Sequence, residues 1–256
     1  MLLRRLGRRL RDHDWLPVLV EMLVVIAGIL IALQLDNWKQ ARQDASRGDA
    51  YLARMAAEMR ADAAMIDRMV AFRRQVGREG EAAIANGETG ALLDGSAWKT
   101  LRAWYQASQI WPYRKPRVAF DEMVARGDLG LVRDAALRSR IAGTYSDNAV
   151  SGVVEVLQLM PAYRENVRGH MPWKVQRYIW AHCIRADGDA QELRDCPPPI
   201  DEAEATRLLA GLRGDPLLLR QLRFWMTTNQ LADDILRQVR DQVGTLARDI
   251  DAARRQ

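Results

Sequence analysis

A long apolar run near the start of the chain constrains the fold more than any other feature of the sequence. Leu16 to Leu35 is twenty residues, of which fourteen are Leu, Ile, Val or Met. A helix of that length spans about 30 Å, the thickness of the hydrocarbon core of a bilayer. Glu21 costs at most about 3 kcal/mol there, against roughly 4–8 kcal/mol gained by the aliphatic residues. The sequence therefore predicts a transmembrane helix over residues 16–35; the alternative is a buried helix of a soluble protein.

The residues that flank this run predict an uncleaved signal anchor. Trp15 and Trp38 lie at its two ends, as interfacial aromatic residues do. Five arginines precede the run, but no small-residue cleavage site follows it. Residues 1–15 hold five basic residues and residues 36–50 hold three, so the positive-inside rule places the N-terminus in the cytoplasm. We expect a basic cytoplasmic tail at residues 1–15 and an external domain at residues 36–256.

The formal net charge of +5 does not indicate a nucleic-acid partner. Residues 1–15 contribute five arginines minus Asp12 and Asp14, which is +3, and Glu21 contributes −1. Subtracting these from +5 leaves +3 for residues 36–256, which is close to neutral for a segment of this length. The high isoelectric point thus reflects the tail, and we expect the bilayer rather than nucleic acid as a partner.

The apolar run also carries a motif. Glu21 is followed by a Val/Ile run, then by Gly28-Ile-Leu-Ile-Ala-Leu-Gln34, and then by Leu35-Asp36-Asn37-Trp38. This pattern resembles a bacterial family of domains of unknown function whose members also begin with a short basic tail. The likeness is dense from Glu21 to Asp62, looser to residue 150 and thin beyond it, and Lys39-Gln40 departs from the usual acidic or amide pair. The resemblance implies a single-pass protein of the bacterial inner membrane with a periplasmic domain, and it implies no activity.

Three residues of the predicted membrane helix share one face. Glu21 and Gly28 are seven residues apart, and Gly28 and Ala32 are four apart. Small residues let helix backbones approach closely in lipid, and a carboxylate on the same face favours a protein partner over acyl chains. We therefore expect Glu21, Gly28 and Ala32 to pack against a second copy of the chain or another membrane protein. The alternative is that Gly28 is incidental and that Glu21 reaches the membrane surface.

The rest of the chain predicts an all-α fold, a helical bundle with long N- and C-terminal helices. Its apolar residues recur at intervals of three and four, and no stretch alternates with the period of a strand. The first long helix is expected over Asp44–Val76, and the glycines at 77, 80, 87, 90 and 95 predict a loop after it. Shorter helices are expected over Ala97–Gln109, Val118–Arg126, 135–160, Pro172–Cys183 and Glu202–Leu212.

The last long helix has the clearest periodicity. Asp215 is a good N-cap residue, and Pro216 suits the first helical position. Apolar residues then follow at steps of four and three from Leu218 to Ala253, with Asn229 as the single polar member. This pattern is typical of a heptad seam. We expect the seam to pack antiparallel against the Asp44–Val76 helix; a coiled coil between two chains is the alternative.

Cys183 and Cys196 are the two cysteines of the chain, and they enclose a polar loop. Outside the cytoplasm such a pair most often forms a disulfide, and a loop of this length gives about 3 kcal/mol of stabilisation. We expect the disulfide, with free thiols as the alternative. A zinc site with His170 or His182 is not expected, because a second pair of ligands at suitable spacing is missing.

An aromatic and basic stretch supplies the one candidate ligand pocket. Trp104, Trp111 and Tyr113 could form its walls, with Arg114 and Arg117 at its mouth for an anionic ligand. Aromatic residues at helical spacing are also typical of a hydrophobic core, so burial is the alternative.

No catalytic motif is present in the sequence. There is no Gly-x-Ser-x-Gly, no phosphate-binding glycine loop and no His-Glu-x-x-His. We expect a structural or interaction protein without enzymatic activity or a cofactor. The alternative is a ligand-sensing helical bundle that signals through a separate membrane partner, because a tail of fifteen residues is too short for an output domain.

Overall fold

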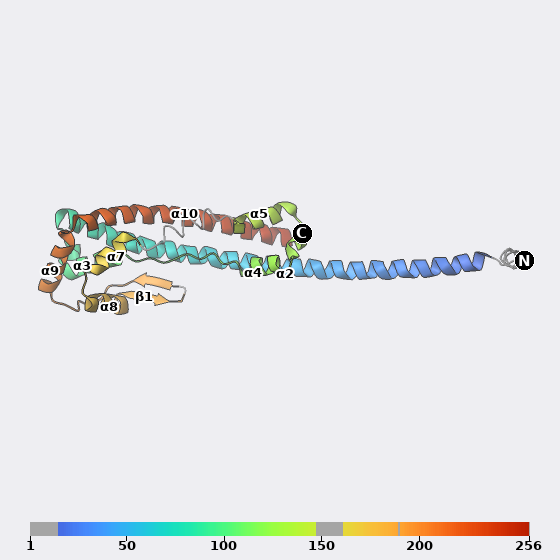
Figure 1. Ribbon diagram of the computed structural model, residues 1–256, viewed down its shortest axis with the longest axis horizontal. Coiled ribbons are helices and arrows are strands. Elements are labelled where there is room, and N and C mark those ends of the chain that lie inside the picture. The colour runs from blue at the N-terminus through green and yellow to red at the C-terminus, as the bar shows by residue number, and fades with distance from the viewer. Residues whose placement is uncertain (1–14, 147–160, 189, 256) are drawn as a thin grey trace, which may run out of the picture. The chain divides into compact units, whose positions relative to one another are not determined.

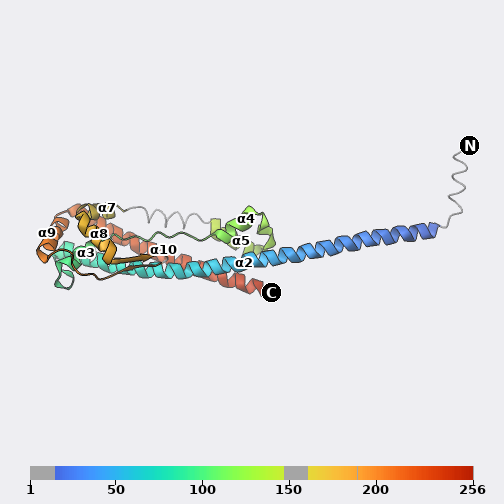
Figure 2. The ribbon, with the colours of Figure 1, turned by 90° about the horizontal axis from the view of Figure 1, so that it is seen from below.

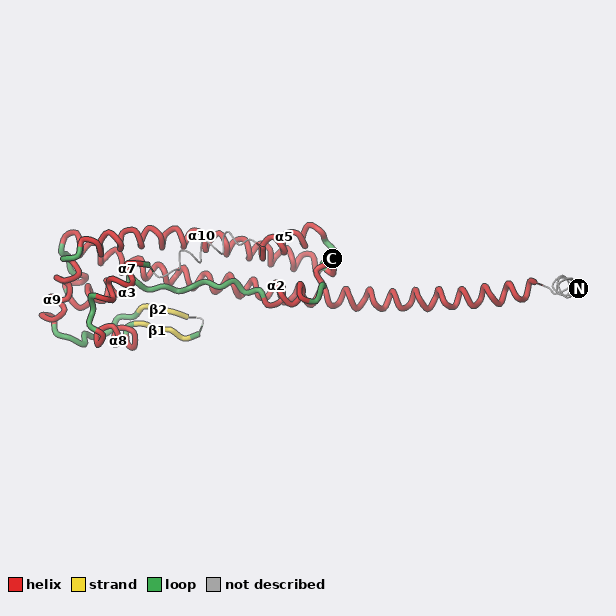
Figure 3. Tube along the Cα trace, in the orientation of Figure 1, coloured by secondary structure: helices red, strands yellow, loops and turns green. Residues whose placement is uncertain are grey.

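The computed structural model describes residues 15–146, 161–188 and 190–255, and within them the chain is helical with one two-stranded sheet (Figures 1 and 3). The predicted basic tail up to Asp14 and the predicted end of a helix at Met160 lie outside the described residues. The two long predicted helices are present as α2 (Trp15–Thr89) and α10 (Pro216–Arg254). Between them lie η1 (Leu93–Gly95), α3 (Ala97–Gln106), α4 (Val118–Ala125), η2 (Asp128–Leu131), α5 (Ala135–Ser146), α7 (Ala162–Gly169), α8 (Trp173–His182), β1 (Ile184–Asp187), β2 (Ala190–Leu193) and α9 (Glu202–Arg213).

The chain divides into two units, Met1–Ala50 and Tyr51–Gln256. The described part of the first unit is a single helical segment, the N-terminal part of α2, and its side chains are exposed from Leu19 to Gln43. The second unit contains the remainder of α2 and every other element, and it buries most of its large apolar side chains.

The predicted loop is present only from Gly90 onward, so the predicted end of the helix at Val76 was wrong. α2 continues through the glycines at 77, 80 and 87 and ends at Thr89. The chain leaves the helix at Gly90, whose φ of +79° favours glycine and whose N–H donates to the carbonyl of Asn86 at 2.8 Å.

Packing explains why the helix keeps two of these glycines, Gly80 and Gly87. A Cβ atom at Gly80 would clash with Sδ of Met226, and one at Gly87 would lie 2.8 Å from Cδ1 of Leu219. Both neighbours belong to α10. The glycines therefore let the two long helices approach each other closely, which sequence spacing alone did not distinguish from a loop.

Within the second unit, α10 packs antiparallel to α2 (Figures 1 and 2). Arg60 pairs with Asp251 at 2.6 Å near one end, and Glu88 pairs with Arg223 at 2.5 Å near the other. The predicted seam is buried within the chain along its length, except that its last member, Ala253, is partly buried. Its buried residues are Leu218, Leu222, Trp225, Asn229, Ala232, Leu236, Val239, Val243, Leu246 and Ile250.

The hydrophobic core consists of two clusters that share the two long helices. The first cluster joins residues 51–76 of α2 and the C-terminal half of α10 to α4, α5 and Trp111. The second joins the N-terminal half of α10 and the end of α2 to α3, α7, α8, α9 and the hairpin. The shorter helices accordingly gather at opposite ends of the α2–α10 pair (Figures 1 and 2).

The start of each of several helices agrees with the sequence. Ser96 accepts a hydrogen bond from the N–H of Lys99 at 3.3 Å before α3. Asp215 accepts from the N–H of Leu217 at 2.9 Å before α10, with Pro216 at the first position. These N-cap contacts satisfy backbone donors that a helix cannot pair internally, so the boundaries are set by local sequence.

The all-α prediction needs one correction, because β1 and β2 form an antiparallel hairpin (Figure 3). Ile184 pairs with Leu193, and Asp187 pairs with Ala190. The strands are four residues each, and Ile184 is the one buried residue in them, so burial does not alternate along either strand. The sequence signal for a strand is therefore too short to detect.

Candidate functional site

The first candidate site is the apolar part of α2. The helix is long and apolar enough to cross a membrane from Leu19 onward, and no part of the apolar window is buried. Glu21, Gly28 and Ala32 are all exposed, and nothing among the described residues lies within 4 Å of a Cβ placed at Gly28. Their spacing puts them on one helix face, as predicted.

The apolar segment gives way to polar residues at its C-terminal end. The guanidinium of Arg42 lies 4.7 Å from the ring centroid of Trp38, one turn earlier on α2. A cation over an indole face is an attractive contact, and Trp is common at the edge of a bilayer. Arg47 then pairs with Asp44 at 2.6 Å. The helix thus changes within a few residues from uniformly apolar to charged.

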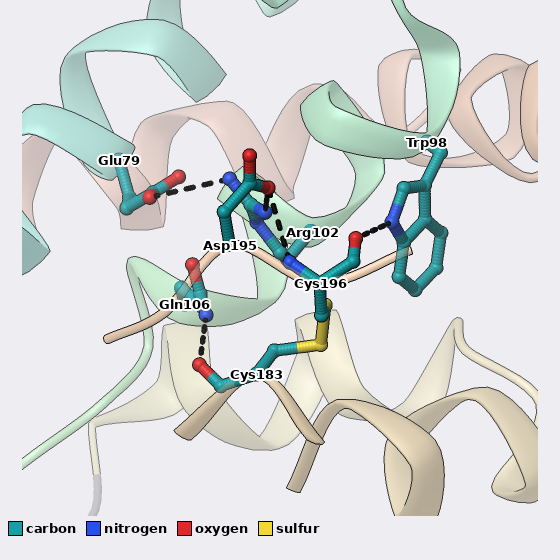
Figure 4. Close-up of a disulfide and its surroundings, with 7 residues drawn as sticks. All are labelled: Glu79, Trp98, Arg102, Gln106, Cys183, Asp195 and Cys196. Carbon is teal, nitrogen blue, oxygen red and sulfur yellow. Dashed lines mark hydrogen bonds and ion pairs between the residues drawn. A yellow bond between two sulfur atoms is a disulfide. The ribbon is translucent and has the colours of Figure 1, made fainter. Parts of the chain in front are cut away.

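The second candidate site is the disulfide, which closes the hairpin (Figure 4). Cys183 caps the end of α8 and Cys196 follows β2, and their sulfur atoms are bonded, with the Cα atoms 5.2 Å apart. Both residues are buried in the second hydrophobic cluster. The pairing agrees with the sequence prediction.

One face of α3 holds this disulfide in place. The indole N–H of Trp98 donates to the carbonyl of Cys196 at 3.1 Å, and the amide of Gln106 donates to the carbonyl of Cys183 at 2.9 Å. Arg102 lies between these two side chains and pairs with Asp195, the neighbour of Cys196 (Figure 4). Because the three residues are four apart, each contact comes from the same side of the helix.

Arg102 also connects the disulfide to α2. Its Nη2 lies 3.9 Å from Oε1 of Glu79, and its side chain is only 7% exposed. Burial raises the pKa of Glu79, and the positive charge of Arg102 partly offsets this rise. The hydrogen bond from Arg102 lowers the pKa of Asp195. The sequence did not single out Arg102 or Glu79, because isolated charged residues on a helix are usually solvent-exposed.

The residues of the predicted ligand pocket fall in separate places. Trp104 belongs to the second hydrophobic cluster, where its N–H donates to Asn86 at 3.1 Å. Trp111 belongs to the first cluster and contacts the ring of Phe72 edge-on. The two indoles are therefore core residues of different clusters, which is the alternative that their helical spacing left open.

The polar members of the same prediction are also apart. Tyr113 donates to Asp62 at 2.8 Å, and Arg117 is exposed and pairs with Asp121 at 2.9 Å. Arg114 is exposed. Burial raises the pKa of Asp62 to about 6, although the hydrogen bond from Tyr113 and the charge of Lys115 act in the opposite direction.

Among the described residues, no group of three or more His, Cys, Asp or Glu side chains is arranged to hold a metal ion. His170 lies on the surface, 3.2 Å from the carboxylate of Asp215, and His182 contacts the ring of Tyr178. Each of these two histidines therefore has a local structural contact.

Comparison with known proteins found no matching family model, no matching curated protein and no matching solved structure.

Proposed function

We propose that this chain is a single-pass membrane protein without enzymatic activity, which acts as a structural or interaction protein. The observation that carries the proposal is the contrast between the two units. The segment from Leu19 to Leu35 leaves its aliphatic side chains exposed, whereas the unit from Tyr51 to Gln256 buries two hydrophobic clusters. A contiguous apolar surface of this length on a helix is expected to be covered by lipid or by another protein.

The proposed orientation places the N-terminus in the cytoplasm and the helical unit in the periplasm of a bacterial inner membrane. The excess of arginine before the helix supports this orientation, as does the disulfide, because disulfides persist in oxidising compartments. In this orientation the hairpin lies in the periplasm, where the Cys183–Cys196 disulfide is stable.

Membrane fractionation tests the anchor. The full chain should resist alkaline extraction from bacterial membranes, and a variant that lacks residues 16–35 should be released. Alkylation of thiols in intact cells should find Cys183 and Cys196 unreactive until a reductant is added. Release of the full chain, or reduced thiols protected from an impermeant reagent, would contradict the anchor or its orientation.

Within the membrane we propose that the face of Glu21, Gly28 and Ala32 contacts a second copy of the chain or another membrane protein. Crosslinking in native membranes followed by mass spectrometry should recover a defined complex. Gly28→Leu should reduce its yield, because the added side chain keeps helix backbones apart. Ala27→Leu adds similar bulk about 100° around the helix and should leave the complex intact. Equal yields from both variants would contradict this contact.

A second candidate function is ligand sensing by the helical unit, with a separate membrane partner as the output. A groove between α2 and α10, lined by four arginines, favours it. The excess of arginine over acidic residues in its lining favours an anionic ligand.

A further inference from the structure

Three buried polar side chains interrupt the interface between α2 and α10. Arg73 on α2 and Asn229 and Asp233 on α10 are 5%, 6% and 9% exposed. Asn229 and Asp233 lie on α10 between Trp225, which belongs to the second hydrophobic cluster, and Leu236, which belongs to the first. The interface therefore contains a polar layer where the two clusters meet.

The polar groups of this layer are only partly paired. Nη1 of Arg73 donates to Oδ1 of Asn229 at 2.7 Å, and Nε of Arg73 lies 3.7 Å from Oδ1 of Asp233. The first bond fixes the orientation of the amide, so its NH₂ group points away from Arg73. Neither this NH₂ nor Nε of Arg73 has a hydrogen-bond acceptor among the described residues, and Oδ1 of Asp233 has no donor there. Buried polar groups normally have a partner, so this layer holds two unpaired donors beside one unpaired acceptor.

All three side chains line a groove of about 670 Å³. This volume lies within the range of roughly 300–1,000 Å³ that is typical of small-molecule sites. Gly77 also lines the groove, and nothing lies within 4 Å of a Cβ placed there, so the groove is open above this turn of α2.

The side chains that line the groove carry a net positive charge, which favours an anionic ligand. Its lining contains Arg73, Arg74, Arg78 and Arg223 against Glu81 and Asp233, which gives four positive charges minus two negative ones, or +2. Arg237 also approaches Asp233, at 3.7 Å, so that carboxylate is held between two guanidinium groups.

The two rim arginines are available to a ligand. Arg74 and Arg78 are exposed, and within the described parts of the chain neither lies within ion-pair distance of a carboxylate. Their charges still act on nearby groups, that of Arg74 on Asp233 and that of Arg78 on Glu79. Arg223, by contrast, is engaged by Glu88. Met226 and Ile84 add an apolar patch to the same lining.

We propose that this groove binds a small organic oxyanion, a molecule with carboxylate or phosphate groups and a short apolar part. Arg73 and Asn229 form the floor that receives one anionic group, and Arg74 and Arg78 close over it from the rim. Arginine suits this role because its planar fork matches carboxylate and phosphate oxygens. The proposal deepens the second candidate function and does not depend on the membrane anchor.

Equilibrium dialysis of the full-length protein in detergent tests the site, with radiolabelled inorganic phosphate and radiolabelled citrate as separate probes at constant ionic strength. We expect saturable binding of at least one probe, with one site per chain; the probe that binds identifies the oxyanion. Arg74→Gln and Arg78→Gln should each weaken binding roughly tenfold or more, because a hydrogen bond to a charged group is lost. Gly77→Phe should abolish binding by filling the groove.

Matched controls separate the groove from general effects of charge and bulk. Arg220→Gln removes an exposed arginine of α10 outside the groove, and Gly211→Phe adds bulk at an open glycine of α9. Both should bind as the parent does, and circular dichroism should show that all variants keep the parent fold. Absence of saturable binding of both probes, or binding that the three groove variants leave unchanged, would overturn the proposal. Failure of the membrane anchor would instead appear in fractionation, with dialysis unaffected.

Discussion

At the scale of single residues, the helical unit keeps several charged groups away from water. Asp62 is 4% exposed, and its carboxylate receives a hydrogen bond from Tyr113 at 2.8 Å. The cost of burial outweighs this contact and raises the pKa of Asp62 to about 6 from 3.8. The folded protein therefore retains this proton at pH values where the unfolded chain has released it.

The sign of the resulting pH dependence follows from linkage. Between pH 3.8 and about 6 the folded state binds more protons at Asp62 than the unfolded state does, so the contribution of Asp62 to stability falls as pH rises. Asp62→Asn should remove this loss and raise the free energy of unfolding at pH 7 by about 2–3 kcal/mol, with little gain at pH 3.5. Urea unfolding at both pH values measures the difference. The exposed Asp67→Asn serves as the control, and an equal effect of Asp62→Asn at both pH values would contradict the assignment.

Arg102 is the residue whose removal should cost most stability near the disulfide. Arg102→Gln leaves the mostly buried Glu79, whose side chain is 17% exposed, without the charge of Arg102, which should lower the free energy of unfolding by about 1–3 kcal/mol. Glu79→Gln in the same chain should restore part of that loss, because the uncompensated charge is then gone. Chemical denaturation of the four members of this double-mutant cycle gives the coupling.

A matched surface pair calibrates that cycle. Arg117→Gln breaks the exposed contact to Asp121, where both side chains are about half exposed, and should cost less than about 1 kcal/mol. If Arg102→Gln lowers the free energy of unfolding no more than Arg117→Gln does, the pair of Arg102 and Glu79 does not stabilise the contacts of α3 around the disulfide.

At the scale of elements, the contact between α2 and α10 depends on where glycine occurs. Gly87→Leu should destabilise the fold by about 1–3 kcal/mol, because its Cβ alone would lie 2.8 Å from Leu219 and 3.3 Å from the ring of Trp104. Gly77→Leu, on the same helix with open space at its Cβ, should instead stabilise by up to about 1 kcal/mol through helix propensity. Thermal unfolding of the two variants compares them directly; a shift of the same sign in both would contradict close packing at Gly87.

The same glycines show how far the sequence predicts the elements. Local signals were sufficient where a cap residue is present, as at Ser96 and Asp215. Local signals predicted a loop wrongly at Gly80 and Gly87. A single sequence does not distinguish a glycine that ends a helix from a glycine that makes room for a neighbouring helix. The second kind is recognised only once Met226 and Leu219 are known to lie opposite.

The candidate sites were predictable to different degrees for a related reason. The disulfide was predicted because cysteine has few alternatives outside the cytoplasm. The aromatic pocket was proposed from proximity in sequence, but the extended segment after α3 carries Trp111 to the other cluster from Trp104. The basic groove was not predicted, because Arg73 and Asn229 are 156 residues apart and meet only through the antiparallel pairing of the long helices.

At the scale of the whole molecule, solubility should depend on residues that precede the helical unit. The described part of the helical unit, residues 51–256, buries most of its large apolar side chains. The aliphatic side chains from Leu19 to Leu35 are exposed. A chain that begins at Asp44 should therefore be soluble without detergent, form the Cys183–Cys196 disulfide under oxidising conditions and unfold cooperatively. Size-exclusion chromatography and thermal unfolding measure both properties, with the full chain in detergent as the reference. Aggregation of the shortened chain, together with an intact disulfide, would show that the helical unit needs the N-terminal segment for more than attachment.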